Sequence, residues 1–408
     1  MEAETATRPP PSTVDGGVAR PDRVVGLDGV RGLAALYVML FHCWLRGFHS
    51  FPYDSGPIWL AWLLYGHLAV VVFITLSGFS LGISPARHDW QLGGLGRYAR
   101  RRAWRILPPY WAALAFSLLI AWAVTPQPHS GPPNLRTVAV YGLLLQDNVV
   151  ARTPNGAMWS IAVEAELYLL LPLLLLLRRR IRAIALVAAV MIPVVLYGLL
   201  GPQASPENRL TGLTPLFAAP FAIGLVAAGV LAAGARTRGW PWHWLAVLTA
   251  APTVALMLIY RSQWTVAHYY WIDLALAPAI AMMLAALATG RPAPAMWLLG
   301  TRPLRSLGSF SYSLYLIHLP IVIVVSRYVV GGRVPGGRIE FLATAGVAVP
   351  VSLLAARLFA AVFEIPFQRY RGWAQLRRAY LAWRSRLAQR MGRAQRADPV
   401  PSLDPSDP

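Results

Sequence analysis

The chain has 408 residues, of which 56% are hydrophobic and 13% are charged, and its mean hydropathy is +0.49. A soluble domain carries roughly 25% charged residues, so this composition excludes an ordinary soluble protein. The formal net charge is +20, and the cationic side chains are all arginines. On a soluble protein such a charge would suggest nucleic acid, but arginines also collect in the cytoplasmic loops of membrane proteins. We therefore expect the lipid bilayer as a partner and no nucleic acid.

Apolar runs of about twenty residues recur along the chain, each long enough to cross a bilayer core of roughly 30 Å as a helix. The runs do not alternate apolar and polar residues as barrel strands do. We predict an all-α, polytopic membrane helix bundle with about ten transmembrane helices. These lie near residues 27–47, 58–83, 104–124, 157–177, 182–200, 213–234, 242–260, 269–289, 309–331 and 340–363.

The start of the fourth predicted helix has an alternative. Residues 137–150 are also apolar enough to form a short re-entrant or interfacial helix ahead of it.

Arginines gather in alternate loops. Clusters follow the second, fourth, sixth and eighth predicted helices, whereas the other loops hold one or two arginines each. By the positive-inside rule the clustered loops are cytoplasmic, so both termini are predicted to be cytoplasmic. The clusters are Arg97, Arg100, Arg101, Arg102 and Arg105; Arg178, Arg179, Arg180 and Arg182; Arg236 and Arg238; and Arg291, Arg302 and Arg305.

The pattern divides the chain into four segments. Residues 1–24 are polar and contain prolines, which predicts a disordered cytoplasmic tail, and residues 25–368 form the transmembrane domain. Residues 369–396 place apolar side chains and arginines on opposite helical faces, which is typical of an amphipathic helix lying on an anionic leaflet. Residues 397–408 are predicted to be a disordered C-terminal tail.

The first predicted helix carries Arg31 and His42 within an apolar run. Eleven residues turn through about 1100°, so both side chains share one stripe, about 16 Å apart along the axis. Ionisable side chains inside a membrane are costly and usually face a protein interior or a wet cavity. Asp28, one turn before Arg31, can pair with it. The alternative is that Arg31 reaches the headgroups and His42 is an interfacial residue; spacing alone leaves both open.

The fourth predicted helix contains two carboxylates in an apolar run. Ser160, Glu164 and Tyr168 share one of its faces. Because an outer loop feeds this helix, we expect Glu164 at a depth similar to that of His42. A carboxylate at that depth can orient a histidine base.

The ninth predicted helix opens with Ser311, Tyr315 and His318 on one face. His318 either lines the same cavity or hydrogen-bonds a neighbour, and the pattern favours the structural role.

Three further sequence features can be explained without a direct role in catalysis. Ser77 and Gly78 form a small pair that favours close helix contact. Five arginines at 97–105 precede Pro108 and Pro109, which we predict to start the third helix. Guanidiniums can bind phosphate through paired hydrogen bonds, although such a cluster can also serve only to set the membrane topology. The single Cys43 excludes an intrachain disulfide and a cysteine-ligated metal site, and we predict no metal.

Taken together, these stretches resemble the acyltransferase 3 family of integral-membrane O-acyltransferases. Five motifs carry the resemblance, in order and on the expected helices, over residues 27–320. Glu166 departs from the pattern, because that position more often holds glutamine or tryptophan. The motifs are L-D-G-V-R-G-L-A with the arginine-to-histidine spacing that ends at His42, F-I-T-L-S-G-F, R-R-x-x-R-I-L-P-P-Y, W-S-I-A-V-E-x-E-L-Y-L-L-L-P and S-Y-S-L-Y-L-I-H-L-P.

The resemblance implies an enzyme that moves an acyl group, often acetyl, from cytoplasmic acyl-CoA to a hydroxyl of a glycan, lipid or secreted small molecule. It implies a multi-pass protein of the inner, cytoplasmic membrane, with acyl-CoA as co-substrate and no permanently bound cofactor. Whether the catalytic histidine acts as a base or is itself acylated stays open. The implied site residues are His42, Arg31 and Glu164 for catalysis, and Arg102, Arg105, Arg101 and Ser77 for acyl-CoA binding.

The rival prediction is a transporter or flippase in which Arg31, His42 and Glu164 form a proton or ion relay. Transporters commonly contain internal repeats with broken helices, and the two halves of this sequence show no convincing repeat. A relay also gives no role to the arginine cluster before the third helix. The sequence therefore favours an enzyme.

Overall fold

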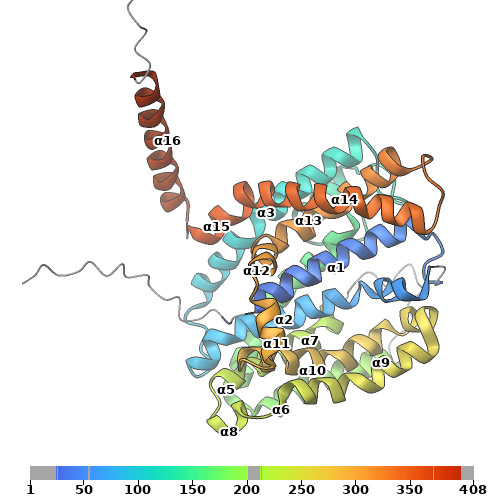
Figure 1. Ribbon diagram of the computed structural model, residues 1–408. Helices are drawn as coiled ribbons and strands as arrows, with labels where there is room; N and C mark the ends of the chain where they lie inside the picture. The colour runs from blue at the N-terminus through green and yellow to red at the C-terminus, as the bar shows by residue number, and fades with distance from the viewer. Residues whose placement is uncertain are drawn as a thin grey trace, which may run out of the picture.

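The computed structural model describes residues 24, 26–53, 56–200, 212, 214–370 and 372–396. Within these ranges the chain is helical and contains no strand. Figure 1 shows α1 in the middle of the bundle, with α3, α13 and α14 on one side and α2, α7, α10 and α9 on the other. Helix α16 projects away from the bundle.

The helical elements alternate long helices with short 3-10 and π segments. Of the short segments, η1, η2 and η3 are 3-10 helices, and η4 and η5 are π-helices. In chain order the elements are α1 Leu27–Gly47, η1 Ile58–Tyr65, α2 Leu68–Arg87, α3 Leu95–Ala123, α4 Leu135–Gly142, η2 Gly156–Met158, α5 Trp159–Arg180, α6 Ala183–Leu200, α7 Thr214–Ala227, η3 Ala228–Leu231, α8 Ala235–Arg238, α9 Trp242–Ala267, α10 Tyr269–Ala288, α11 Ala293–Leu299, α12 Arg302–Ser309, α13 Ser311–Val324, η4 Val325–Val330, α14 Arg338–Phe359, η5 Ala360–Glu364, α15 Ile365–Arg369 and α16 Trp373–Arg396.

The prediction of an all-α polytopic bundle is confirmed. Among the described residues, 9 helical stretches are long and apolar enough to cross a membrane. Helix α1 has 21 residues but is more polar, because it carries Asp28, Arg31, His42 and Arg46. The cytoplasmic placement of the termini stays a prediction, as does contact of α16 with a leaflet. The predicted tails lie outside the described residues, apart from residue 24.

Two predicted helix starts are wrong. The second predicted helix is split, because residues 58–65 form η1 and α2 begins only at Leu68. The third begins at Leu95, so Pro108 and Pro109 lie inside α3 rather than at its start. Prolines are tolerated within membrane helices, and the arginines before them continue the helix beyond its apolar part, which hydropathy cannot detect.

The alternative for residues 137–150 is partly correct. They contain the end of a short helix, α4, which Asn134 and Thr137 begin with a reciprocal capping box. The chain then enters the bundle before α5 starts. The fully buried Asn155 side chain donates from Nδ2 to the Leu316 carbonyl of α13, over 2.8 Å. This contact fixes the depth at which α5 begins.

Helices α2 and α7 are packed backbone against backbone. A Cβ atom added at Gly78 would lie 2.1 Å from the Phe221 carbonyl oxygen, and one added at Gly224 would lie 2.0 Å from that of Thr75. Glycines thus allow the close approach from both sides, as the small pair in the sequence predicts. The contact turns the neighbouring Ser77 toward the interior of the bundle.

Gly78→Ala is expected to destabilise the protein, because the added methyl group overpacks this contact at a cost of about 1–3 kcal/mol. The measurement is the midpoint of thermal unfolding in detergent. Gly346→Ala in α14 is the matched control, because an added Cβ there has nothing within 4 Å. If both variants unfolded at the wild-type midpoint, the backbone contact between α2 and α7 would be refuted.

Candidate active site

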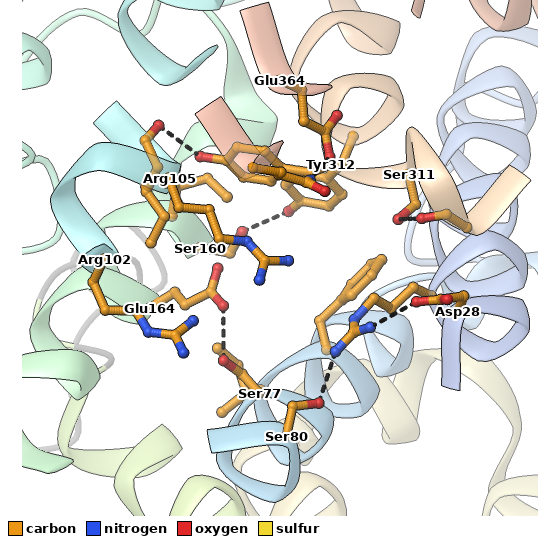
Figure 2. Close-up of a pocket in the computed structure, with 18 of the residues that line it drawn as sticks. Asp28, Ser77, Ser80, Arg102, Arg105, Ser160, Glu164, Ser311, Tyr312 and Glu364 are labelled. Carbon is orange, nitrogen blue, oxygen red and sulfur yellow. Dashed lines mark hydrogen bonds and ion pairs between the residues drawn. The ribbon is translucent and has the colours of Figure 1, made fainter. Parts of the chain in front are cut away.

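A cavity of about 460 Å³ lies inside the bundle, and we call it the Arg102 cavity. Helices α1, α2, α3, α5, α13 and the π-helix η5 all contribute to its wall. Figure 2 shows the side chains of Arg102, Arg105 and Glu164 directed into one space, with Ser77 and Ser80 facing them. The cavity brings together five of the seven predicted site residues: Arg31, Ser77, Arg102, Arg105 and Glu164.

Arg31 links α1 to α2 within the cavity wall. Its Nη1 lies 3.1 Å from Asp28 Oδ1, and its Nη2 donates to Ser80 Oγ over 2.7 Å. Arg31 is 27% exposed, so the ion pair lies largely inside the protein. The first helical turn is held there by α12, since a Cβ added at Gly308 would lie 1.9 Å from the Asp28 carbonyl oxygen. The predicted pairing of Asp28 with Arg31 is confirmed.

Arg102 and Arg105 bring two positive charges into a cavity that Glu164 and Glu364 also line. The Arg102 guanidinium lies 5.7 Å from the centre of the Tyr168 ring and 6.0 Å from that of Tyr98. Within the described part of the chain, neither arginine has a carboxylate oxygen within 4.0 Å. The two lie one turn apart on α3, a spacing that suits two contacts to one anionic group.

Arg101 does not join them. It is exposed and is not part of the cavity wall. The next residue along a helix is turned by about 100°, so Arg101 points away where Arg102 points in. Arg101 therefore lies apart from Arg102 and Arg105, and its role in acyl-CoA binding stays a prediction.

Glu164 is tied to α2 by hydroxyl groups. Ser77 Oγ donates to its Oε1 over 2.8 Å, and the Tyr168 hydroxyl donates to the same oxygen. Ser77 and Tyr168 also lie 3.0 Å apart, so the three side chains form one network. Since Arg102 lies over the Tyr168 ring, this network holds both the carboxylate and the ring beneath the guanidinium.

The expected pairing of Glu164 with His42 is wrong. Asn155 already lies beside the α13 carbonyl of Leu316, two residues before His318. Glu164 follows Asn155 by nine residues, so it lies about 13 Å further along the helix axis, on the Arg31 side of the cavity. The sequence placed the start of α5 too far out, because it did not show that the segment before this helix is buried.

The partner of His42 is instead His318. His42 Nδ1 lies 3.1 Å from His318 Nε2 and 2.9 Å from the Val38 carbonyl oxygen. This histidine pair lies beyond the cavity wall at Tyr315, whose ring centre is 5.9 Å from that of His318. Ser160 Oγ is 2.6 Å from the Tyr315 hydroxyl, so the α5 side chain that contacts this wall residue is Ser160 rather than Glu164.

The hydrogen bonds assign the protons of the pair. His318 Nδ1 lies 2.8 and 3.1 Å from the carbonyl oxygens of Tyr315 and Leu314, so it must be a donor. An imidazole with one proton then has Nε2 as an acceptor, and His42 donates to it from Nδ1. The free lone pair of His42 is therefore on Nε2, the nitrogen that a base would use.

The sequence left two alternatives for His318, lining the cavity or hydrogen-bonding a neighbour, and the structure shows the second, with His42 as the neighbour. One contributor was missed from sequence. Glu364 lies in the π-helix η5, is 3% exposed, and accepts from Ser313 Oγ over 2.5 Å. The criterion that singled out Glu164, a carboxylate in an apolar run, would have found Glu364 too. Glu166 lies outside the cavity and bonds Asn148.

A metal site was not predicted. Among the described residues, no group of three or more histidine, cysteine, aspartate or glutamate side chains is arranged to hold a metal ion.

Comparison with known proteins identifies the family. The sequence profile of the acyltransferase domain, acyltransferase 3, matches residues 24–357, which is most of the chain. The chain belongs to the acyltransferase 3 family. It is thus a multi-pass membrane protein and an O-acyltransferase, and the transporter prediction is not supported. No solved structure matches it.

The curated relatives carry acyltransferase names. The acyltransferase MdmB of Streptomyces mycarofaciens is 27% identical over 86% of this chain and 94% of its own length. The O-acetyltransferase OatA of Staphylococcus aureus is 23% identical over 77% of this chain, which spans only 53% of that protein. The putative membrane-bound transacylase BcsY of Komagataeibacter xylinus is 26% identical over 37% of each chain.

The proton assignment can be measured directly. In protein labelled with ¹⁵N-histidine, we expect the ¹⁵N shifts of His42 and His318 to report a proton on Nδ1 in both rings. His42→Gln and His318→Gln identify the two sets of signals by removing one each. A proton on Nε2 of His42 would contradict the assignment.

Proposed function

We propose that the enzyme transfers an acyl group, acetyl in the simplest case, from cytoplasmic acyl-CoA to an acceptor hydroxyl, with His42 as general base. The observation that supports this proposal is the order in which the arginines, Tyr315 and the histidine pair follow one another through the bundle. Three arginines line the Arg102 cavity, and the histidine pair lies just beyond the wall formed by Tyr315.

Arginines suit the phosphates of coenzyme A, since a guanidinium can bind phosphate oxygens through two parallel hydrogen bonds. Arg102 and Arg105 are the best candidates, because no carboxylate of the described chain pairs with them. The pantetheine arm would then extend through the cavity past Arg31 and present the thioester toward His42. The predicted cytoplasmic position of the α3 arginines agrees with a donor that comes from that side.

In the proposed reaction the acceptor oxygen attacks the thioester carbonyl carbon while His42 Nε2 takes the hydroxyl proton. The carbon–sulfur bond then breaks, the acyl group stays on the acceptor oxygen, and the thiolate of coenzyme A receives the proton from His42. His318 and the Val38 carbonyl would hold the ring in position and stabilise its charged form through Nδ1. In this scheme His42 both accepts and donates the one proton that is transferred.

Arg102→Gln is expected to weaken acyl-CoA binding about tenfold or more, because a hydrogen bond to a charged group contributes about 1.5–3 kcal/mol. The measurement is the KM for acetyl-CoA, together with the rise in unfolding midpoint that CoA produces. Arg101→Gln is the matched control, since it removes the same charge one residue away on the exposed face. Equal effects of the two substitutions would mean that only the net charge of this loop matters.

His42→Ala is expected to abolish acyl transfer while leaving the protein folded. Mass spectrometry would compare glycans, lipids and secreted metabolites from a deletion strain and from the same strain carrying wild type, His42→Ala or Cys43→Ala at equal protein level. Cys43 is the control because it is buried beside His42 on another helical face. A species with one extra acyl group should occur with wild type and Cys43→Ala only; its retention in His42→Ala would remove His42 from the chemistry.

A further inference from the structure

A second pocket, of 530 Å³, lies at the opposite end of the helices that form the Arg102 cavity, and we call it the Arg327 pocket. On α1, Arg31 of the cavity precedes His42, and Arg46 of the pocket follows it by one turn. On α13 and η4, Tyr315 precedes His318 and Ser326 follows it. The histidine pair therefore lies between the two spaces on both helices.

Two more helices show the same order. Helix α3 carries Arg102 in the cavity, and Thr125, just after its last residue, lies in the pocket. Helix α14 runs the other way, with Glu340 of its first turn in the pocket and Glu364 of the following π-helix in the cavity. Four helices thus run from one space to the other, and the histidine pair lies between the two spaces.

The Arg327 pocket has an excess of positive charge. Arg327 Nη1 donates to Thr125 Oγ1 over 2.7 Å, and its guanidinium lies 5.7 Å from the Tyr328 ring centre. No carboxylate oxygen in the described ranges lies within 4.0 Å of it. Glu340 lines the pocket together with Arg46 and Arg327, so this wall has one carboxylate for two guanidiniums. Arg327 belongs to a π-helix, a rare element that frequently marks functional sites.

The remaining polar groups suit hydroxyls. Gln127, Ser326 and the imidazoles of His49 and His129 line the pocket, and they supply donors and acceptors without adding a fixed charge. The volume is in the range of small-molecule sites. This mixture of a guanidinium without a carboxylate partner in the described ranges and several uncharged polar groups fits a sugar that carries an anionic group.

We propose that the Arg327 pocket binds the acceptor, and that this acceptor is a hydroxyl-bearing sugar with a carboxylate or phosphate held by Arg327. The inference rests on the proposed function, because it takes His42 as the base toward which the acceptor hydroxyl is directed. Arg327 would then determine specificity, since a neutral sugar leaves its guanidinium without a charged partner.

The test is a binding measurement that needs no turnover. The purified full chain in detergent is heated with glucuronate, with glucose 6-phosphate, with glucose and with inorganic phosphate, and the unfolding midpoints are compared. We expect glucuronate or glucose 6-phosphate to raise the midpoint at a concentration where glucose and phosphate do not. Arg327→Gln should weaken that binding about tenfold or more, as expected for a lost charged hydrogen bond.

Arg333→Gln is the matched control. Arg333 is exposed, follows the same π-helix, bonds the carbonyl of Val329 and is not part of the pocket wall. Three results would overturn the proposal: no shift with either anionic sugar, an equal shift with inorganic phosphate, or equal losses in Arg327→Gln and Arg333→Gln. A parallel titration with CoA separates the two ideas, because failure of the proposed function removes the CoA shift and failure of this inference leaves it.

Discussion

The Arg31 guanidinium is bound inside the bundle by Asp28 and Ser80, and this contact joins α1 to α2 through a charge that lipid could not solvate. A charge at this position is tolerated only beside partners or water. Asp28 and Ser80 are those partners, and α12 lies close against the first turn of α1, where Asp28 is. The glycine contact at Gly308 makes this approach sterically possible.

The same cost explains why charged side chains within the bundle share a cavity or, like His67 and Asp273, pair with each other. Arg102, Arg105, Glu164 and Glu364 share one cavity, where hydroxyl and amide groups satisfy the carboxylates. The histidine pair lies outside it, and each Nδ1 is supported by a backbone carbonyl. The arginines and the histidines are thus kept apart, and the reaction that we propose needs them in this order.

How much the sequence could predict depends on the kind of information each feature needs. Charges within apolar runs are visible without a structure, so Arg31 and Glu164 were found, and helix phase separates Arg102 from Arg101 once the boundaries of α3 are known. The depth of α5 within the bundle was not predictable. It depends on Asn155, which binds a carbonyl of α13 far along the chain. The contact of His42 with His318 likewise depends on packing between distant helices, which no local pattern encodes.

Neither the Arg102 cavity nor the Arg327 pocket is enclosed, so water and ions can enter the bundle from both ends. The histidine pair and the packed rings of Phe73 and Tyr315 lie between the two spaces. A membrane voltage acts on a charge that crosses such a region, at about 2.3 kcal/mol per charge for each 100 mV crossed in full. In the reaction that we propose, a proton that moves on or off His42 would move within that electric field, and the membrane voltage would then act on the chemistry.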